Sequence, residues 1–307
     1  MRSIAAMGLS EHSKGLLLTF TAILILSPDA LLVQLIQCDI WTLLFWRCLL
    51  TSGMMAVFLL LVYRRGFFRS FHAIGWTGVL SALTITIGSL LFVSALKQTA
   101  AANALIILAA TPVISSLLGW LFLGEKPPIH TRLAILVCFG GILLIFSGSL
   151  RSGLLLGDLL ALGATFMWGA NIVIIRSGRH INMIPANLLG NLGVVPIALL
   201  VGGAQPLAVN PADAGLLLLL GGFLLPVAFA LITLGPRYLN AAEVSLILLL
   251  ETILGPLWVW LVLGAVPAGP TLIAGAVIVG TLVLHTLFSW QQGRAMKPPA
   301  LEQAGLL

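Results

Sequence analysis

Residues 101–127 read AANALIILAATPVISSLLGWLFLGEKP, and residues 241–267 read AAEVSLILLLETILGPLWVWLVLGAVP. The two stretches align without a gap at an offset of 140 residues, and 15 of 50 positions are identical between residues 95–144 and 235–284. An apolar composition raises that figure by chance. The shared Trp-Leu-x-Leu-Gly-x-x-Pro pattern is not what a leucine-rich composition produces, so the chain is predicted to contain an internal duplication.

Long apolar segments surround this repeat. Ten of them lie between Lys14 and Trp290, and charged residues fall almost entirely in the short gaps between them. A helix of about 20 apolar residues crosses a hydrocarbon core of ~30 Å, and the alternating pattern of barrel strands is missing. The chain has 60% hydrophobic and only 8% charged residues. The sequence therefore predicts an all-α polytopic membrane protein with ten transmembrane helices. The expected spans are 14–34, 41–63, 73–94, 99–123, 130–149, 156–175, 184–202, 213–234, 241–263 and 270–290.

The basic residues give a predicted orientation. If the N-terminus is cytoplasmic, twelve of the fifteen lysines and arginines fall in cytoplasmic segments, while Lys97 and Arg151 lie outside and Arg47 lies within the second span. This distribution is a strong positive-inside bias. We expect a multi-pass membrane protein with both termini cytoplasmic. The net charge of +6 follows from that orientation, and no feature indicates nucleic-acid binding.

The repeat divides the chain into two halves. We expect a first five-helix repeat at residues 10–150, a second at residues 151–292 and a flexible cytoplasmic tail at residues 293–307. Because five is an odd number of crossings, the second repeat enters the membrane upside down. Inverted repeats of this kind place a substrate near the midplane and allow alternating access. The alternative is a duplication that is retained only for packing.

The repeated motifs resemble those of the drug/metabolite transporter superfamily, and in particular its EamA-type bacterial members. The resemblance rests on the two Trp-Leu-x-Leu-Gly blocks, the Gly124-Glu125-Lys126-Pro127-Pro128 turn, Arg47, and the Trp168-Gly169-Ala170-Asn171 segment. It implies a secondary exporter of small metabolites, with the aromatic-amino-acid exporters as a plausible close group. The first helix has Ser27-Pro28-Asp29 in place of the Trp168 segment, and the second turn, Gly264-Ala265-Val266-Pro267, lacks the Glu-Lys pair.

Ionisable residues inside the spans are the first candidate functional residues, because each costs about 2.5–3.5 kcal/mol on insertion scales. Glu251 lies halfway along span nine and aligns with Thr111 of the first half. We expect Glu251, and also Asp29 beside Pro28, to take part in proton coupling. The alternative for Glu251 is a structural role at the interface of the halves, and the alternative for Asp29 is a position near the outer water boundary. For Arg47 we favour a structural role, either snorkelling outward or pairing with Asp29 or Asp39.

Polar and aromatic residues within the spans are predicted to bind the substrate. Trp168 and Asn171 are three residues apart, so they share a helix face and offer a stacking surface beside an amide. The alternative for this pair is helix packing. Pro112 and Pro256, near the midplane of spans four and nine, are predicted hinges. The full predicted substrate-binding set is Trp168, Asn171, Glu251, Ser245, Thr111, Thr84 and Asn187.

The charge content of the spans limits the substrate. Arg47 is the one basic residue well within a span, which disfavours phosphorylated cargo. We expect a secondary transporter that exports small amphipathic metabolites, namely aromatic or apolar amino acids, by alternating access. Export of cationic amines or drugs is the alternative, and a channel or a non-transporting membrane protein is the rival class. No catalytic motif is present, so we expect no enzyme, cofactor or metal. The expected partners are a small-molecule substrate and the lipid bilayer, with the chain as a monomer.

Overall fold

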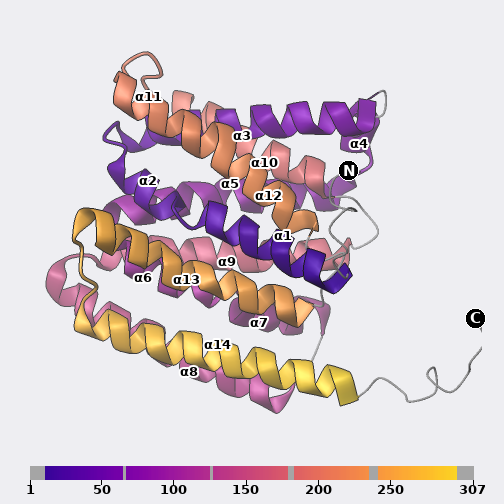
Figure 1. Cartoon of the computed structure of the whole chain (residues 1–307), viewed down its shortest axis with the longest axis vertical. Coiled ribbons are helices and arrows are strands. Elements are labelled where there is room, and N and C mark those ends of the chain that lie inside the picture. Colours follow the sequence, from indigo (N-terminus) through magenta and orange to yellow (C-terminus); the bar gives the residue numbers. More distant parts are fainter. Residues whose placement is uncertain (1–10, 65–66, 125–126, 179–182, 235–240, 296–307) are drawn as a thin grey trace, which may run out of the picture.

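The computed structural model describes residues 11–64, 67–124, 127–178, 183–234 and 241–295, and in these ranges the chain is helical without a strand (Figure 1). The helices of the first half are α1 (Glu11–Leu26), α2 (Asp29–Leu35), α3 (Ile40–Tyr63), α4 (Phe67–His72), α5 (Gly75–Gln98), α6 (Ala101–Ala109), α7 (Thr111–Leu123) and α8 (Ile129–Ser152). Those of the second half are α9 (Leu155–Ser177), α10 (Ile184–Leu200), α11 (Pro211–Leu217), the π-helix η3 (Leu218–Leu224), α12 (Leu225–Leu234), α13 (Ala241–Leu263) and α14 (Gly269–Ala295). The prediction of an all-helical polytopic membrane protein is confirmed.

Membrane-crossing segments follow the expected order. Among the described residues, eight segments are long and apolar enough to cross a bilayer, and two shorter apolar helices, Ile184–Leu200 and Ile247–Leu263, stand where spans seven and nine were expected. Span seven therefore forms a helix although Asn187, Asn191 and Pro196 dilute its apolar character. Successive spans run back and forth between two ends of the bundle. We call the end with residues 36–39, on the left of Figure 1, the Asp39 end, and the opposite end, on the right, the His72 end.

Two spans are divided at prolines by the same local device. Pro28 separates α1 from α2, and Pro112 lies at the start of α7, directly after the break that follows α6. A proline leaves the carbonyl four residues earlier without its helical donor. In each case the hydroxyl of the preceding residue bonds to that carbonyl: Ser27 donates to Leu24 at 3.0 Å, and Thr111 donates to Leu108 at 2.6 Å. The carbonyl group that each proline deprives of its donor therefore accepts a hydrogen bond from a side chain of the same span.

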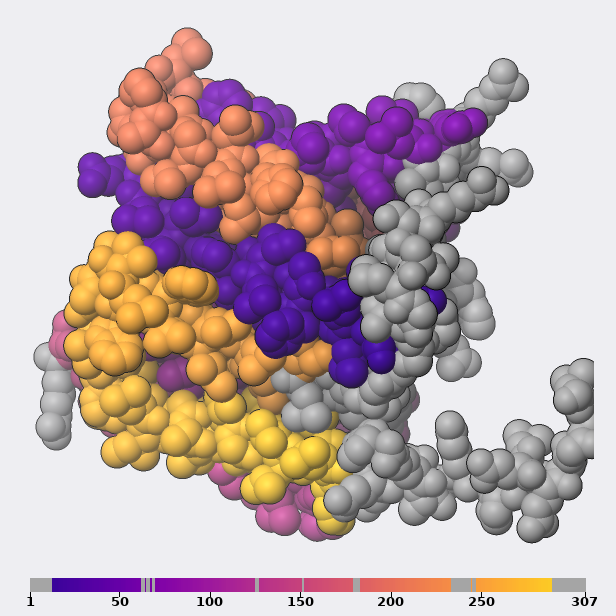
Figure 2. All heavy atoms as spheres, viewed as in Figure 1, coloured from indigo at the N-terminus to yellow at the C-terminus, as the bar shows by residue number. Residues whose placement is uncertain are grey.

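Packing between the halves follows a pattern that maps onto itself when the halves are exchanged. The third span (α5) packs along the sixth (α9) and the seventh (α10), and the eighth (η3 and α12) packs along the first (α1) and the second (α3). The second span packs on the seventh (α10), and the fifth (α8) packs on the tenth (α14). Figure 2 shows α12, α1, α13 and α14 lying one beside another on one face. Such a pattern is expected when the two halves have the same helix arrangement. That the second half is inverted relative to the first stays a prediction.

The pair α8 and α14 lies at the edge of the bundle (Figure 1) and is fastened near both ends. Toward the His72 end, a hydrogen bond of 2.9 Å joins the Thr131 hydroxyl to His285 Nε2. Toward the Asp39 end, Asn103 of α6 bridges the two helices, because its amide nitrogen donates to Ser149 and its oxygen accepts from Thr271. Between these points Gly141 lies against Ile278 so closely that a Cβ would be 2.7 Å from that side chain. This allows the helices to approach closely.

Large apolar side chains cover the outside of the bundle. Examples are Leu61, Leu121, Phe122 and Leu136, each about 70% exposed. In a water-soluble protein such a surface drives association, whereas in a bilayer it contacts lipid chains. The outer surface is therefore the lipid-facing side, and polar residues are concentrated between the helices.

Candidate functional site

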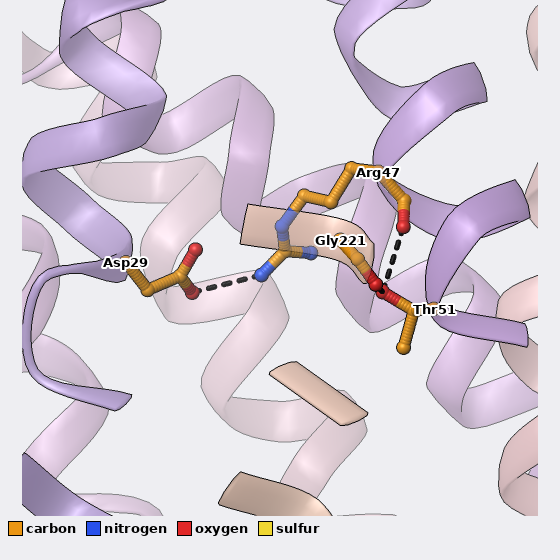
Figure 3. A network of polar contacts seen from close by, with 4 residues as sticks. All are labelled: Asp29, Arg47, Thr51 and Gly221. Atoms are coloured by element: carbon orange, nitrogen blue, oxygen red, sulfur yellow. Dashed lines mark hydrogen bonds and ion pairs between the residues drawn. The ribbon is translucent and has the colours of Figure 1, made fainter. Parts of the chain in front are cut away.

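A buried ion pair joins the break in the first span to the second span. Asp29, at the start of α2, accepts from an Arg47 terminal nitrogen of α3 at 2.8 Å, and both side chains are about 7% exposed (Figure 3). The preference for this partner over Asp39 follows from local structure, since Asp39 instead accepts the backbone N–H groups of Trp41 and Thr42 as the cap of α3. Of the structural roles expected for Arg47, snorkelling outward or pairing with Asp29 or Asp39, the structure shows the pairing with Asp29.

The pair is not fully satisfied. Asp29 Oδ1 and Arg47 Nε are buried and have no hydrogen-bond partner among the described residues. Arginine and carboxylate usually form two parallel hydrogen bonds, whereas a single bond is made here. One donor and one acceptor of the pair are therefore left without a partner inside the bundle, where an unpaired polar group costs about 1–3 kcal/mol. Such a place suits a small polar ligand or a water molecule.

The backbone around Arg47 rests on the π-helix of the eighth span. The Thr51 hydroxyl lies 2.7 Å from the Arg47 carbonyl and 3.2 Å from the Gly221 carbonyl, so its hydrogen is shared between α3 and η3 (Figure 3). A Cβ on Gly221 would lie 2.8 Å from the Arg47 carbonyl oxygen. Glycine is thus required at this close approach, and π-helical turns are often found at functional sites.

Glu251 provides a second carboxylate on a helix that packs against the ion-pair region. It lies midway along α13 and is half-buried, and its side chain forms no hydrogen bond or ion pair with any described residue. The helix α13 packs on α2, which begins with Asp29. Two turns further along α13, Trp258 Nε1 donates to the Ser27 hydroxyl at 2.9 Å, which holds this helix against the break between α1 and α2. The two carboxylates predicted for proton coupling therefore lie on neighbouring helices that pack against each other.

Aromatic rings connect this charged cluster to the predicted Trp168. The guanidinium carbon of Arg47 lies 6.0 Å from the centre of the Phe92 ring, and the Phe92 ring lies 5.2 Å from that of Trp168. A Cβ on Gly88 would be 2.8 Å from Trp168 Nε1, so this glycine of α5 leaves room for the indole. A cation within about 6 Å of an aromatic face is attracted to it. The guanidinium of Arg47, the Phe92 ring and the Trp168 ring therefore follow one another in space.

Asn171 and Thr84 come together one turn beyond Trp168. The Asn171 side-chain oxygen accepts from the Ser81 hydroxyl at 2.6 Å and from the Thr84 hydroxyl at 3.3 Å. These three residues join α5 to α9 and are buried or half-buried. We call the whole series the polar–aromatic belt, with the members Glu251, Asp29, Arg47, Phe92, Trp168, Asn171, Thr84 and Ser81.

Other predicted residues are placed differently. The Thr111 hydroxyl donates to Leu108 within its own span, as described above, and Asn187 accepts from Asn191 on α10. Among the described residues, neither side chain forms a hydrogen bond with a member of the belt. Ser245 lies in α13, but its side chain is outside the described part of the chain. Of the predicted hinges, Pro112 coincides with a helix break, whereas α13 continues through Pro256. The hinge roles stay predictions.

Sequence reasoning missed a second polar network, at the Asp39 end. Asp158 of α9 is fully buried and accepts hydrogen bonds from Thr99 and from Asn103, which in turn holds Ser149 and Thr271 as described above. Its members come from both halves. The available signal was an acidic residue in the first turn of span six.

The side chains of the belt suit the binding of a ligand rather than the catalysis of a reaction. It offers two carboxylates and one guanidinium at one end, two rings in the middle, and an amide with hydroxyls at the other end. Among the described residues no three His, Cys, Asp or Glu side chains gather in a way that would hold a metal ion. An amphipathic molecule with a charged head and an apolar body matches this order of groups.

Comparison with known proteins agrees with the fold. The model of the EamA-like transporter family matches the chain twice, at residues 13–147 and at residues 155–287. An uncharacterised transporter of Archaeoglobus fulgidus is 29% identical over 223 residues, which cover 68% of this chain and 75% of the relative. A protein of known crystal structure has the same fold, with a TM-score of 0.60 and 21% identity over 91% of this chain and 99% of that one.

Proposed function

This chain belongs to the EamA-like transporter family, and hence is a membrane transporter and not an enzyme; we propose that it exports small amphipathic metabolites, namely aromatic or apolar amino acids. The observation that carries this proposal is the polar–aromatic belt. Its carboxylates and guanidinium match the ammonium and carboxylate of an amino acid, and its rings match an apolar side chain. Five of its members come from the first half and three from the second.

We propose that transport proceeds by alternating access between two inverted halves, residues 10–150 and 151–292. The self-mapping packing pattern and the two separate matches to the family model support related halves. The breaks at Pro28 and Pro112 provide places where helices bend without losing further hydrogen bonds. In this mechanism the halves move relative to each other so that the belt is open to one side of the membrane at a time.

Proton coupling through Glu251 is part of the proposal. A carboxylate without a partner, beside a second carboxylate, is costly in a membrane interior, and binding a proton removes that cost. Asp29 is already neutralised by Arg47, so Glu251 is the group that exchanges its proton with bulk water. Facilitated exchange without protons is the alternative mechanism.

The proposed location is the bacterial inner membrane, with both termini in the cytoplasm and the chain as a monomer. Basic residues support this orientation. Lys14, Arg64, Arg132 and Arg176 lie near helix ends at the His72 end of the bundle, whereas Lys97 lies at the Asp39 end. Cytoplasmic segments are the ones enriched in lysine and arginine.

Transport into proteoliposomes tests the proposed substrate. Purified protein should take up radiolabelled phenylalanine with saturable counterflow, and Trp168→Ala should lower that transport about tenfold, a loss of ~1.4 kcal/mol. The matched control is Trp120→Ala, because Trp120 is 48% exposed on the lipid-facing side of α7. Equal loss in both variants, or no amino-acid flux in the unmodified protein, would contradict the proposal.

Export of cationic amines or drugs is the second candidate, and one observation favours it. The charged end of the belt has two carboxylates against one guanidinium, so it attracts a cation once Glu251 is ionised. Competition separates the two candidates: phenethylamine and phenylalanine share a ring but differ in the carboxylate. An amino-acid exporter is inhibited better by phenylalanine, and an amine exporter by phenethylamine.

A further inference from the structure

The linker between the first two spans is held at the Asp39 end by a carboxylate of the other half. Asp213, in the first turn of α11, is buried, and its two oxygens accept the backbone N–H groups of Gln37 and Cys38 at 3.0 and 2.9 Å. Asn210 donates to the same carboxylate at 2.9 Å and fixes its orientation. Hydrogen bonds from N–H groups to a carboxylate are stronger than those between neutral groups. We call this contact the Asp213 clamp.

The Asp213 clamp holds the far end of α2. This helix has seven residues, about 10.5 Å, and so covers about a third of a hydrocarbon core of ~30 Å. It begins at Asp29 of the belt, directly after the break at Pro28, and its last residue, Leu35, is followed by the clamped linker (Figure 1). The helix therefore runs from the belt to the Asp39 end, beside the route by which a solute would leave the belt on that side.

Directed contacts hold α2 less firmly than they hold α3. Three hydrogen bonds of side chains join α3 to the second half, namely those of Trp46 with Pro206, Thr42 with Gln205 and Thr51 with Gly221. Within the described ranges, Asp29 is the side chain of α2 that forms a hydrogen bond, and the helix otherwise packs against α13, α5 and η3. Apolar packing is non-directional. The end of α2 can therefore shift against these neighbours once the linker is released.

We propose that α2 is the moving segment of a gate at the Asp39 end, and that Asp213 is the positioning residue that keeps this gate closed. Release of the Gln37 and Cys38 N–H groups frees the end of α2, which rotates about the break at Pro28 and uncovers the belt on that side. The inference rests on the proposed alternating access, and it names the segment that opens one of the two ends.

The break at Pro28 suits a hinge because the surrounding contacts stay in place. The Ser27 hydroxyl donates to the Leu24 carbonyl and accepts from Trp258 of α13, so the α1 side of the break is fixed. Asp29 stands directly beyond the break, where a rotation displaces the chain least, and its bond to Arg47 is kept. Opening therefore costs the hydrogen bonds of the Asp213 clamp and spares the buried ion pair.

Labelling of a cysteine on α2 tests the gate. Gln34 is half-buried near the end of α2, so Gln34→Cys, in a protein whose native cysteines are replaced, reports on the exposure of that end. Asp213→Ala removes both acceptors and should speed the reaction with a water-soluble maleimide about tenfold, as expected for an opening equilibrium that loses hydrogen bonds of modest net strength. Asp213→Asn keeps one acceptor oxygen and should give an intermediate rate.

Asp39→Ala is the matched control. The Asp39 carboxylate lies beside the same linker and also accepts two backbone N–H groups, but these belong to Trp41 and Thr42 of its own helix, so labelling of Gln34→Cys should be unchanged. Cys138, fully buried in α8 and kept as the single cysteine, reports on general unfolding and should stay unreactive in Asp213→Ala. An unchanged rate at Gln34→Cys, an equal rise in Asp39→Ala or a parallel rise at Cys138 would overturn the gate.

Fastening α2 tests whether its movement is part of transport. Gln34 and Val259 of α13 line one crevice, so cysteines at both positions can be joined by a cleavable bis-maleimide. The cross-link should abolish phenylalanine transport and cleavage should restore it, whereas the same reagent on Gln34→Cys alone should have little effect. Undiminished transport by the cross-linked protein overturns the gate and leaves the proposed function standing. The labelling experiment needs no solute, so failure of the unmodified protein to transport any amino acid overturns the proposed function instead.

Discussion

The Asp29–Arg47 pair makes a sharp prediction at the level of single residues. Removing one partner of a buried ion pair leaves an uncompensated charge and costs about 3–5 kcal/mol, whereas replacing both by apolar residues is often neutral. We therefore expect Arg47→Met to lower the thermal stability of the detergent-solubilised protein strongly. The double variant Asp29→Leu with Arg47→Met should recover most of that loss while remaining inactive in transport. If the double variant is no more stable than Arg47→Met, the uncompensated charge of Asp29 is not the cause of the stability loss.

Cys38, which lies between the first two spans, gives a pH-dependent prediction. Burial, together with the nearby carboxylates of Asp213 and Asp39, raises the pKa of this thiol to about 11. Only the thiolate reacts with maleimides, so a raised pKa lowers reactivity at neutral pH and restores it as the pH approaches the pKa. We expect labelling of Cys38 to be slow at neutral pH and to accelerate about tenfold per pH unit. Asp213→Asn should speed the reaction at neutral pH, because it removes one of the carboxylates that raise the pKa of Cys38. An unchanged rate would contradict a contribution of Asp213 to that pKa.

Individual residues were predictable from the sequence where their chemistry is unusual for a membrane span. Glu251, Asp29 and Trp168 stood out for that reason, and they do belong to one belt. Phe92 was missed because a phenylalanine in an apolar helix carries no sequence signal. Thr111 was expected to contact substrate, but its hydroxyl is used by the proline break beside it. Such a local competitor is visible only once the helix geometry is known.

At the scale of helices, the hydroxyl-before-proline device predicts a specific dependence on Thr111. Thr111→Val keeps the shape of the side chain but removes the hydroxyl that donates to the Leu108 carbonyl, which should destabilise the protein by about 1–3 kcal/mol. Thr281→Val is the matched control. Its hydroxyl bonds to the Val277 carbonyl inside an unbroken, exposed stretch of α14, so we expect a small effect. Thermal unfolding of both variants in detergent checks this, and equal stability losses would argue against the device.

The spans themselves were predicted well, because apolar length is a strong signal. Their boundaries differ from the expected ones by a few residues, and the spans divided at Pro28 and Pro112 contain prolines that the sequence makes visible. The π-helix Leu218–Leu224 was not predicted. Its residues are as apolar as their neighbours, and the wider turn depends on the contact of Gly221 with α3, which local sequence does not encode.

For the whole molecule, the positive-inside pattern predicts which end of the bundle faces the cytoplasm. Gln37 and Arg64 are both exposed, at the Asp39 end and the His72 end respectively. In intact cells of a strain that expresses a cysteine-free form, Gln37→Cys should be labelled by an impermeant maleimide, whereas Arg64→Cys should be labelled only after permeabilisation. The reverse result would invert the proposed orientation.

The pairing of the halves was foreseen in outline from the 140-residue repeat, but not in its details. The Asp158 network is the clearest example, since Thr99, Asn103, Ser149 and Thr271 are ordinary polar residues near span ends. Only the packing of α6, α8, α9 and α14 around one carboxylate turns them into a connection between the halves.

The doubly fastened pair of α8 and α14 restricts how the molecule can move. Because the contact between α8 and α14 is held near both ends, the two helices resist sliding along each other and moving apart. Rotation of one helix against the other is then the movement that costs the least free energy. If the two halves rotate relative to each other, the axis of rotation lies along α8 and α14 at the edge of the bundle. The widest opening then occurs at the opposite edge, beside α3 and α10. Lipid packing around α8 and α14 would then remain nearly constant through the cycle, while the annulus around the opposite edge would have to stretch and relax at every turnover.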